Sequence, residues 1–250
     1  MSDEILLKEG ERLDDLQRMG LHIIQAPGEF CFGMDAVLLT GFAAEHVSGS
    51  GFRLMDLCTG SGIIPILLSA KTEAARLSGM EIQPRVADMA KRSVSLNSLD
   101  EKIEIINDDI KKAAEYFNAA SFDVVTVNPP YFKKGHGLVN PEDSKSICRH
   151  EISCTLKDVL ECASYLLREG GAFYMVHRPH RMAEIIEEMR RAGIEPKTLK
   201  CVHARADADA TMILLEGRKG GGAEMCVERP LIIYGEDGEY TEEMGRIYGY

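Results

Sequence analysis

Short apolar runs alternate with helical patterns along most of this chain, and this alternation restricts its fold more than any other feature. Seven runs have the length and composition of strands: 53–58, 77–82, 103–107, 122–127, 172–177, 197–203 and 212–216. Helical spacing fits five segments: 63–70, 85–97, 111–117, 156–167 and 181–192. Such alternation predicts an α/β fold with a doubly wound, mostly parallel seven-stranded sheet. No clear helix separates the last two runs, so we expect them to form an antiparallel C-terminal hairpin.

The chain length of 250 residues suits a single α/β domain. We expect one domain over 1–250, with an N-terminal extension over 1–52, a core over 53–216 and a C-terminal tail over 217–250. Residues 132–154 form a long polar connection. Connections of that length in a compact domain are usually functional or disordered.

Composition and charge narrow the class of protein. The chain is 45% hydrophobic and 28% charged, and it has no apolar stretch long enough for a membrane helix. Its polar start has no signal-peptide core, so we expect a cytoplasmic protein. The seven cysteines include no Cys-x-x-Cys pair, which argues against a disulfide framework or a metal site. A net charge of −11 argues against a general nucleic-acid binder but allows a local basic patch.

A glycine-rich turn, Asp56-Leu57-Cys58-Thr59-Gly60-Ser61-Gly62, follows the first expected strand. Gly60 and Gly62 let the backbone pass close to a ligand, and this turn lies at the sheet edge where ligands bind. Pro65 stands where a dinucleotide motif has its third glycine or alanine, which disfavours a nicotinamide or flavin cofactor. No Gly-Lys-Ser/Thr follows, which excludes an ATP-binding P-loop. The turn therefore predicts a different nucleoside-like cofactor.

Acidic residues occupy the same edge. Glu81 ends the second strand about 20 residues after the glycines, where an acid binds ribose hydroxyls; the alternative is a carboxylate that caps the next helix. Asp108 and Asp109 end the third strand. We favour Asp109 as the acceptor for an adenine amino group, although it can also cap a helix before Lys111. Asp56 either holds the glycine turn or pairs with an ammonium group of the cofactor.

The segment Asn128-Pro129-Pro130-Tyr131 ends the fourth strand. An exocyclic adenine amine is a poor nucleophile because its lone pair is delocalised into the ring. The Asn128 side-chain oxygen and the Pro129 carbonyl can each accept one amine hydrogen and so favour a tetrahedral nitrogen. The prolines make the turn rigid, and Tyr131 can stack on a flipped-out base beside Pro130. The pattern indicates methyl transfer from S-adenosyl-L-methionine to a nitrogen; the alternative is a rigid turn with Tyr131 in the core.

The polar connection after Tyr131 is mildly basic. Phosphate contacts from such residues would position RNA without reading its sequence, and the alternative is a solvated loop. The basic residues of the connection are Lys133, Lys134, Lys145, Arg149 and His150. Four more residues follow the fifth strand at the same edge and are expected either to extend this surface or to form a solvated helix start: His177, Arg178, His180 and Arg181.

With these motifs the chain resembles the class I S-adenosylmethionine-dependent methyltransferases over about residues 35–216. Asp-x-x-x-Gly-x-Gly at 56–62 and Asn-Pro-Pro-Tyr at 128–131 are similar to the amino-methylating branch of that class. More narrowly, the chain is similar to the bacterial tRNA (adenine-N6)-methyltransferases that modify adenosine 37 of valine tRNA. That likeness rests on Phe32–Leu39, Arg149–Glu151, Pro230–Tyr234 and Gly238–Thr241.

The resemblance implies a Rossmann-like methyltransferase fold, S-adenosyl-L-methionine as the cofactor and tRNA as the substrate. It places the segment around Asp35 beside the methionine end of the cofactor. The acceptor-amine site that it implies consists of Asn128, Pro129 and Tyr131. The implied cofactor site consists of Gly60, Gly62, Glu81 and Asp109.

Two other functions stay open. A glutamine side chain of a protein, such as a translation release factor, presents a planar amide that Asn-Pro-Pro-Tyr serves equally well. Members of that family carry a larger helical N-terminal domain than the 52 residues found before the first strand here. The other alternative is a cofactor-binding RNA assembly factor without catalysis, which the intact Asn128 and Tyr131 disfavour.

Overall fold

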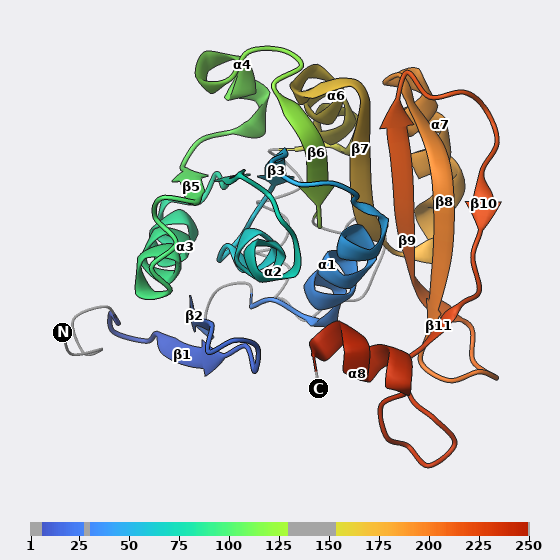
Figure 1. Cartoon of the computed structure of the whole chain (residues 1–250), viewed down its shortest axis with the longest axis horizontal. Coiled ribbons are helices and arrows are strands. Elements are labelled where there is room, and N and C mark those ends of the chain that lie inside the picture. The colour runs from blue at the N-terminus through green and yellow to red at the C-terminus, as the bar shows by residue number, and fades with distance from the viewer. Residues whose placement is uncertain (1–6, 28–30, 130–153, 250) are drawn as a thin grey trace, which may run out of the picture.

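A computed structural model of the chain describes residues 7–27, 31–129 and 154–249. Within these residues nine strands form one twisted central sheet with helices on both faces (Figure 1). All seven expected strands are present: β3 (Arg53–Leu57), β4 (Arg76–Met80), β5 (Ile103–Ile106), β6 (Phe122–Val127), β7 (Leu167–His177), β8 (Ile194–His203) and β9 (Ala210–Lys219). The order across the sheet is β5-β4-β3-β6-β7-β9-β8.

The strand directions confirm the doubly wound class. Strands β3 to β7 pair parallel with one another, whereas β9 is antiparallel to both β7 and β8. The sheet is nevertheless wider than the seven strands predicted. Two short strands, β10 (Cys226–Val227) and β11 (Leu231–Ile232), pair parallel with β8 at the outer edge. Each has only two residues: β10 lies in a polar stretch without a strand-like run, and β11 lies within the short apolar segment Pro230–Tyr234, which was not predicted to be a strand.

The helices cover two separate hydrophobic cores, one on each face of the sheet. One face carries α1 (Met34–His46), α2 (Ile63–Lys71) and α3 (Pro84–Leu96). The other carries η2 (Ile110–Lys112), α4 (Ala113–Tyr116), α6 (Leu156–Leu166) and α7 (Met182–Arg191), the last preceded by η3 (Pro179–Arg181). Side chains of β7 point alternately to the two faces of the sheet, so this strand contributes to both cores. Phe173 and Met175 face α6 and α7, whereas Tyr174 and Val176 face α1. In the part of the chain that the structure describes, the helices are too short or too polar to cross a membrane.

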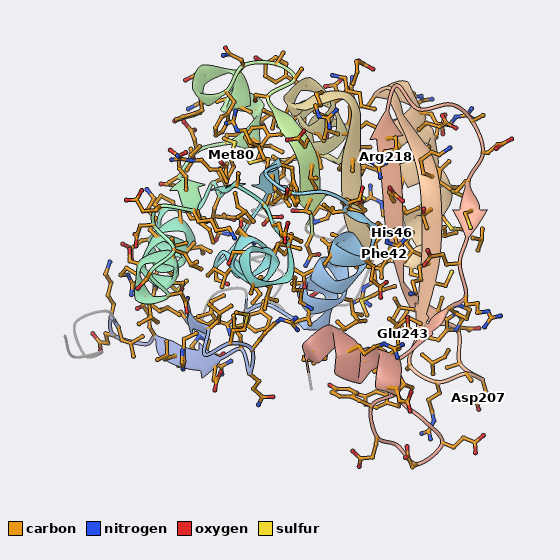
Figure 2. The ribbon with its side chains drawn as sticks, viewed as in Figure 1. Phe42, His46, Met80, Asp207, Arg218 and Glu243 are labelled. Carbon is orange, nitrogen blue, oxygen red and sulfur yellow. The ribbon has the colours of Figure 1, made fainter. Side chains whose placement is uncertain are left out.

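Helix α1 had no counterpart among the predicted helices. Its residues 36–43 are all buried, so the sequence lacks the polar face that makes a helix recognisable. The rings of Phe42 and His46 lie where α1 meets the sheet (Figure 2), and Phe42 packs edge-on against Tyr174. The helix therefore lies within the core between the sheet and the tail.

The N-terminal segment forms a hairpin that packs along α3. Strands β1 (Arg12–Asp15) and β2 (His22–Gln25) pair antiparallel. The backbone N–H of Ile24 donates to Ser93 Oγ at 2.9 Å. Asn97 accepts from the His22 N–H at 2.9 Å and donates to the His22 carbonyl at 2.7 Å. Side chains of α3 thus satisfy the free edge of β2.

The C-terminal tail packs back onto the core. Helix α8 (Glu242–Tyr248) lies against α1. The Lys200 ammonium, which is buried in β8, donates to Glu243 at 2.7 Å. His46 at the end of α1 contacts Glu228 in the tail at 2.9 Å. Three rings of the tail also stack in sequence: Tyr234, Tyr240 and Tyr248.

The contact between α1 and α8 gives a first testable prediction. A Cβ added at Gly41 would lie 2.9 Å from Ile247 Cγ2, so Gly41→Ala should destabilise the protein by about 1–3 kcal/mol through overpacking. In an Ile247→Ala background the clash is removed. Alanine is then the better helix former by about 1 kcal/mol, and the same substitution should stabilise the protein.

Urea unfolding of wild type, the two single variants and the double variant measures whether the effect of Gly41→Ala on the unfolding free energy changes sign. Gly222→Ala is the matched control, since an added Cβ there meets nothing within 4 Å. Its effect should stay within about 0.5 kcal/mol. If Gly41→Ala changes the unfolding free energy in the same direction in both backgrounds, α8 does not pack on α1 as described.

Candidate functional site

The candidate site lies where four neighbouring parallel strands end. Their last paired residues, Leu57, Met80, Ile106 and Val127, form one row across the sheet. The residues that follow therefore share the carboxyl edge: Cys58, Glu81, Asn107 and Asn128. Only β3 separates the strands of Glu81 and Asn128, so their backbones lie about 10 Å apart at the usual strand spacing. We call this set the edge row.

The two glycines of the turn have different tasks. Both adopt left-handed backbone conformations, with φ of +58° at Gly60 and +84° at Gly62. A Cβ at Gly62 would lie 3.3 Å from Ala90 Cβ, so this glycine allows α3 to approach the start of α2. A Cβ at Gly60 would meet nothing within 4 Å. The space in front of Gly60 is open and can receive a ligand close to the backbone.

Glu81 ties the end of β4 to this turn. Its side chain is only 5% exposed. One carboxylate oxygen accepts from the Gly60 N–H at 3.0 Å, and the other accepts from the Gln83 N–H at 2.9 Å. Gln83 Nε2 also donates to this second oxygen at 3.2 Å, so the capacity left for a hydroxyl donor lies on the oxygen that binds Gly60.

Asp56 is fully buried behind the turn. The Thr126 hydroxyl donates to Asp56 Oδ1 at 2.7 Å and so joins β3 to β6. Within the described residues, Asp56 Oδ2 and Thr59 Oγ1 are buried without a hydrogen-bond partner. Burial, with a contribution from the nearby Glu81 carboxylate, raises the pKa of Asp56 to about 7. Both atoms have almost no accessible surface, so they lie in the interior behind the turn and not on its open side.

The two aspartates after β5 are already engaged. Asp109 caps η2, with Oδ1 accepting from the Lys111 N–H at 3.0 Å, so the capping alternative is present. Asp108 accepts from Tyr116 Oη at 2.6 Å and from Lys112 Nζ at 2.9 Å. These two contacts lower the pKa of Asp108 to about 2. Asp109, whose side chain is 21% exposed, keeps an accessible face.

Sequence reasoning missed Asn107 and Thr126. The Asn107 side chain donates to the Glu81 carbonyl at 2.8 Å and locks the ends of β4 and β5 together. Thr126 carries the bond to Asp56 already described. An asparagine directly after a strand is a recognisable turn residue, whereas a threonine inside a strand has no distinguishing context.

Of the residues predicted to bind the acceptor amine, the structure describes Asn128 and Pro129. Asn128 is half-buried and Pro129 is buried at the end of β6. Asp35 lies in the first turn of α1, where it accepts from the Ala36 N–H at 2.9 Å. The remaining predicted site residues lie outside the described residues: Pro130, Tyr131, Lys133, Lys134, Arg149 and His150.

The expected basic extension after β7 is wrong for His177. This side chain is 1% exposed, and its Nδ1 accepts from the Arg178 N–H at 2.8 Å. Burial, together with the Arg181 charge, lowers the pKa of His177 to about 4, so the ring is neutral near pH 7. Arg181 pairs with Glu184 at 2.7 Å. His177 therefore belongs to the interior rather than to a basic surface.

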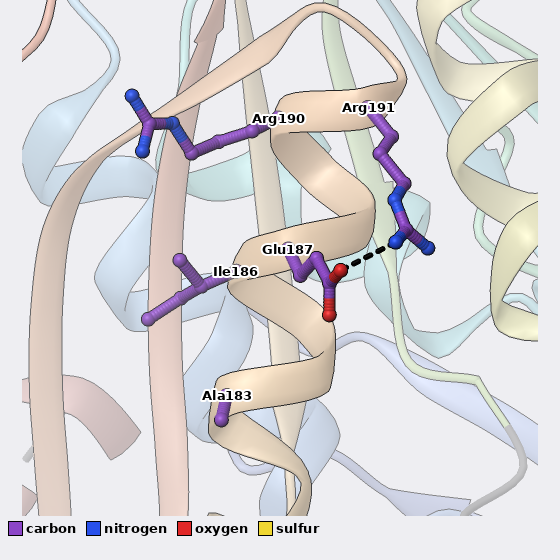
Figure 3. A pocket seen from close by; sticks show the side chains of 5 residues that line it. All are labelled: Ala183, Ile186, Glu187, Arg190 and Arg191. Carbon is purple, nitrogen blue, oxygen red and sulfur yellow. Dashed lines mark hydrogen bonds and ion pairs between the residues drawn. The ribbon is translucent and has the colours of Figure 1, made fainter.

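A surface hollow of about 500 Å³ lies along α7 (Figure 3). Its lining consists of Ala183, Ile186, Glu187, Arg190 and Arg191, all from one helix, and Arg191 pairs with Glu187 across it. None of these residues belongs to the edge row. The hollow is a shallow helix face rather than the catalytic site.

The edge row fits a cationic nucleoside cofactor. Open space faces Gly60, and a buried acid with acceptor capacity left on one oxygen follows β4. The strand order, the antiparallel β9 and this turn define a class I S-adenosylmethionine-dependent methyltransferase. The model of the methyltransferase small domain family matches residues 21–192. The chain belongs to this family and is an enzyme that uses S-adenosyl-L-methionine.

Similar proteins agree with this assignment. A tRNA1(Val) (adenine(37)-N6)-methyltransferase of Aeromonas hydrophila is 25% identical over 84% of this chain and 85% of its own length. The protein of the same name from Bacteroides thetaiotaomicron is 32% identical over 58% of each chain. Among solved structures, a predicted O-methyltransferase from Agrobacterium tumefaciens has a TM-score of 0.70 at 23% identity, covering 86% of this chain and 95% of its own. That structure supports the fold.

The buried Asp56 makes a prediction about stability and pH. Its pKa rises from 3.8 when unfolded to about 7 when folded, so its stabilising contribution is complete below about pH 4 and is lost as the pH rises through 7. Asp56→Asn cannot ionise, and its amide can donate toward Thr59. Relative to wild type, the unfolding free energy of the variant should therefore rise by about 2 kcal/mol between pH 5 and pH 8. A difference that stays constant across this range would contradict the burial of an ionisable Asp56.

Proposed function

We propose that this methyltransferase transfers the methyl group of S-adenosyl-L-methionine to the exocyclic N6 of an adenosine in tRNA, with position 37 beside the anticodon as the target. The observation that carries the proposal is the presence of Asn128 and Glu81 in one edge row, about two strand spacings apart. An acceptor amine at Asn128 is then next to a cofactor held at Glu81. The names of the relatives support adenine in tRNA as the acceptor.

In this proposal the cofactor is held by residues of the first three parallel strands. Glu81 accepts hydrogen bonds from the ribose hydroxyls with the lone pairs left after its bonds to Gly60 and Gln83. Asp109 accepts from the adenine amino group with its exposed face. Gly60 provides close backbone approach, and Asp56 and Asp35 lie toward the methionine end, where a positive ammonium group favours carboxylates.

The acceptor half activates the amine by hydrogen bonding. The cofactor, when bound, supplies an electrophilic methyl group on a sulfonium. Asn128 Oδ1 and the Pro129 carbonyl accept the two amine hydrogens and turn the nitrogen lone pair toward that methyl group. Water takes the proton from the resulting ammonium, so no strong general base is required. Correct placement of two reactants supplies much of the rate acceleration.

RNA is proposed to bind along the connection that follows Tyr131. Tyr131 and Pro130 stack on the flipped base, and Lys133, Lys134 and Arg149, with His150, contact phosphates. A local patch of this kind is compatible with a net charge of −11, because phosphate contacts depend on nearby charges more than on the total. The enzyme would then act in the cytoplasm, where tRNA is found.

Transfer of a tritiated methyl group to separate pools of unmodified tRNA, total protein and DNA tests the acceptor. Digestion of the labelled pool should release N6-methyladenosine from tRNA. A synthetic anticodon stem-loop with inosine in place of adenosine 37 should take no label. Label in protein glutamine would replace the proposal with the alternative substrate, and retained cofactor binding without any label would favour the non-catalytic alternative.

Asn128→Ala tests the amine site. Because the oxygen that orients the amine is lost, kcat should fall by about 10²–10³-fold. Cofactor affinity, measured by calorimetry, should stay within about twofold, because Asn128 acts on the acceptor. Asn128→Asp is the matched variant that keeps an acceptor oxygen, and it should retain more activity. Full activity in Asn128→Ala would reject the assignment.

Glu81 is tested with a pair of ligands, since its loss also frees the Gly60 N–H. Wild type should bind S-adenosylhomocysteine about tens-fold more tightly than its 2′-deoxy analogue, because the missing hydroxyl leaves the carboxylate unpaired. Glu81→Ala should bind both ligands weakly and without discrimination. If the variant still distinguishes the two ligands as wild type does, another group binds the ribose.

A further inference from the structure

The last residue of β2, Gln25, has a buried amide side chain that the proposed reaction does not use. The residue is only 3% exposed. Its Nε2 donates to Asp14 in β1, and its Oε1 accepts from the Phe32 N–H at 3.0 Å. These partners fix the orientation of the amide, because the reverse orientation would set oxygen against oxygen and N–H against N–H. One side chain therefore joins the N-terminal hairpin to the segment that leads into α1.

The hairpin brings this amide toward the edge row. Strand β2 runs along α3 (Figure 1), from the hydrogen bonds that His22 makes at the C-terminal end of α3 to an apolar cluster that Ala26 forms with Val86 near its start. Helix α3 begins three residues after Glu81, which belongs to the edge row. Gln25 directly precedes Ala26, so it lies at the end of the hairpin that is nearest to the edge row.

The segment held by Gln25 leads directly to Asp35. Phe32 lies three residues before this aspartate. Asp35 Oδ1 accepts from the Ala36 N–H at 2.9 Å, and a Cβ added at Gly33 would lie 3.0 Å from the same oxygen. The carboxylate is thus folded against the backbone of its own segment. A shift of this backbone would move the carboxylate with it.

We propose that Gln25 is a positioning residue for the cofactor: its amide holds the backbone at Phe32 and thereby directs the Asp35 carboxylate to the ammonium group of S-adenosyl-L-methionine. This role rests on the proposed cofactor site, in which Asp35 lies toward the methionine end. Without the amide the Phe32 N–H loses its acceptor, and the segment can shift. Charge-assisted hydrogen bonds need short distances and good alignment, so the ammonium group is held less well, whereas the nucleoside contacts at Glu81 and Asp109 are kept.

Two ligands separate this role from a general effect on folding. S-adenosylhomocysteine carries the ammonium group, whereas 5′-methylthioadenosine has the same nucleoside and thioether without the amino-acid end. Gln25→Met keeps the length of the side chain and removes both hydrogen bonds. Calorimetry should show affinity for S-adenosylhomocysteine about tenfold lower in this variant, and affinity for 5′-methylthioadenosine within about twofold of wild type. Equal losses for the two ligands, or wild-type affinity for both, would overturn the proposal.

A matched control uses the same substitution elsewhere on the hairpin. Gln17 is exposed in the turn between β1 and β2, and the structure shows no hydrogen bond from its side chain to the other described residues. Gln17→Met should leave the affinities for both ligands unchanged. If it weakens S-adenosylhomocysteine binding as much as Gln25→Met does, the effect belongs to the hairpin in general and the proposal fails.

A double variant tests whether Gln25 acts through Asp35. Asp35→Asn should show the same selective loss of affinity for S-adenosylhomocysteine, and adding Gln25→Met to it should lower that affinity little further. Fully additive losses, or wild-type affinity in Asp35→Asn, would overturn the proposal. Neither ligand donates a methyl group, so these results do not depend on the acceptor. Methyl transfer to tRNA by the wild-type protein reports separately on the proposed function.

Discussion

The register of the parallel strands is the constraint on which the rest of the site depends. Because β3, β4, β5 and β6 end level with one another, the residues that follow them share one edge. A slip of one residue between β3 and β6 would reverse the faces of their side chains and separate Asp56 from Thr126. The 2.7 Å hydrogen bond between these buried groups fixes that register, and through it the distance from the glycine turn to Asn128.

The charges behind the turn favour one kind of cofactor over another. Asp56 is buried close to Glu81, and their mutual repulsion contributes to the raised pKa of Asp56. A pyrophosphate placed beside the Glu81 carboxylate and a partly ionised Asp56 would be repelled, whereas a sulfonium or ammonium group would be attracted. The electrostatics therefore agree with the sequence argument from Pro65, which disfavours a dinucleotide. Both observations are consistent with S-adenosyl-L-methionine as the cofactor of this family.

Much of the fold was predictable, because short apolar runs indicate buried strands and apolar residues at helical spacing indicate amphipathic helices. Helix α1 was not, since burial on all sides removes its periodicity, and neither were the two-residue strands β10 and β11. In the site, Gly60 and Glu81 were predictable from spacing, and their hydrogen bond agrees with it. Burial cannot be inferred from a residue type, so His177 was wrongly assigned to the surface and the bond of Thr126 was missed.

The central claim is that the glycine turn and the end of β6 form one site, in which the cofactor and the acceptor amine meet. The most direct test is a crystal structure with S-adenosylhomocysteine and adenosine bound together. The account predicts the ribose hydroxyls on Glu81 and the adenosine N6 between Asn128 Oδ1 and the Pro129 carbonyl, facing the cofactor sulfur. Binding of the cofactor away from Gly60 and Glu81, or of the adenosine away from Asn128, would contradict it.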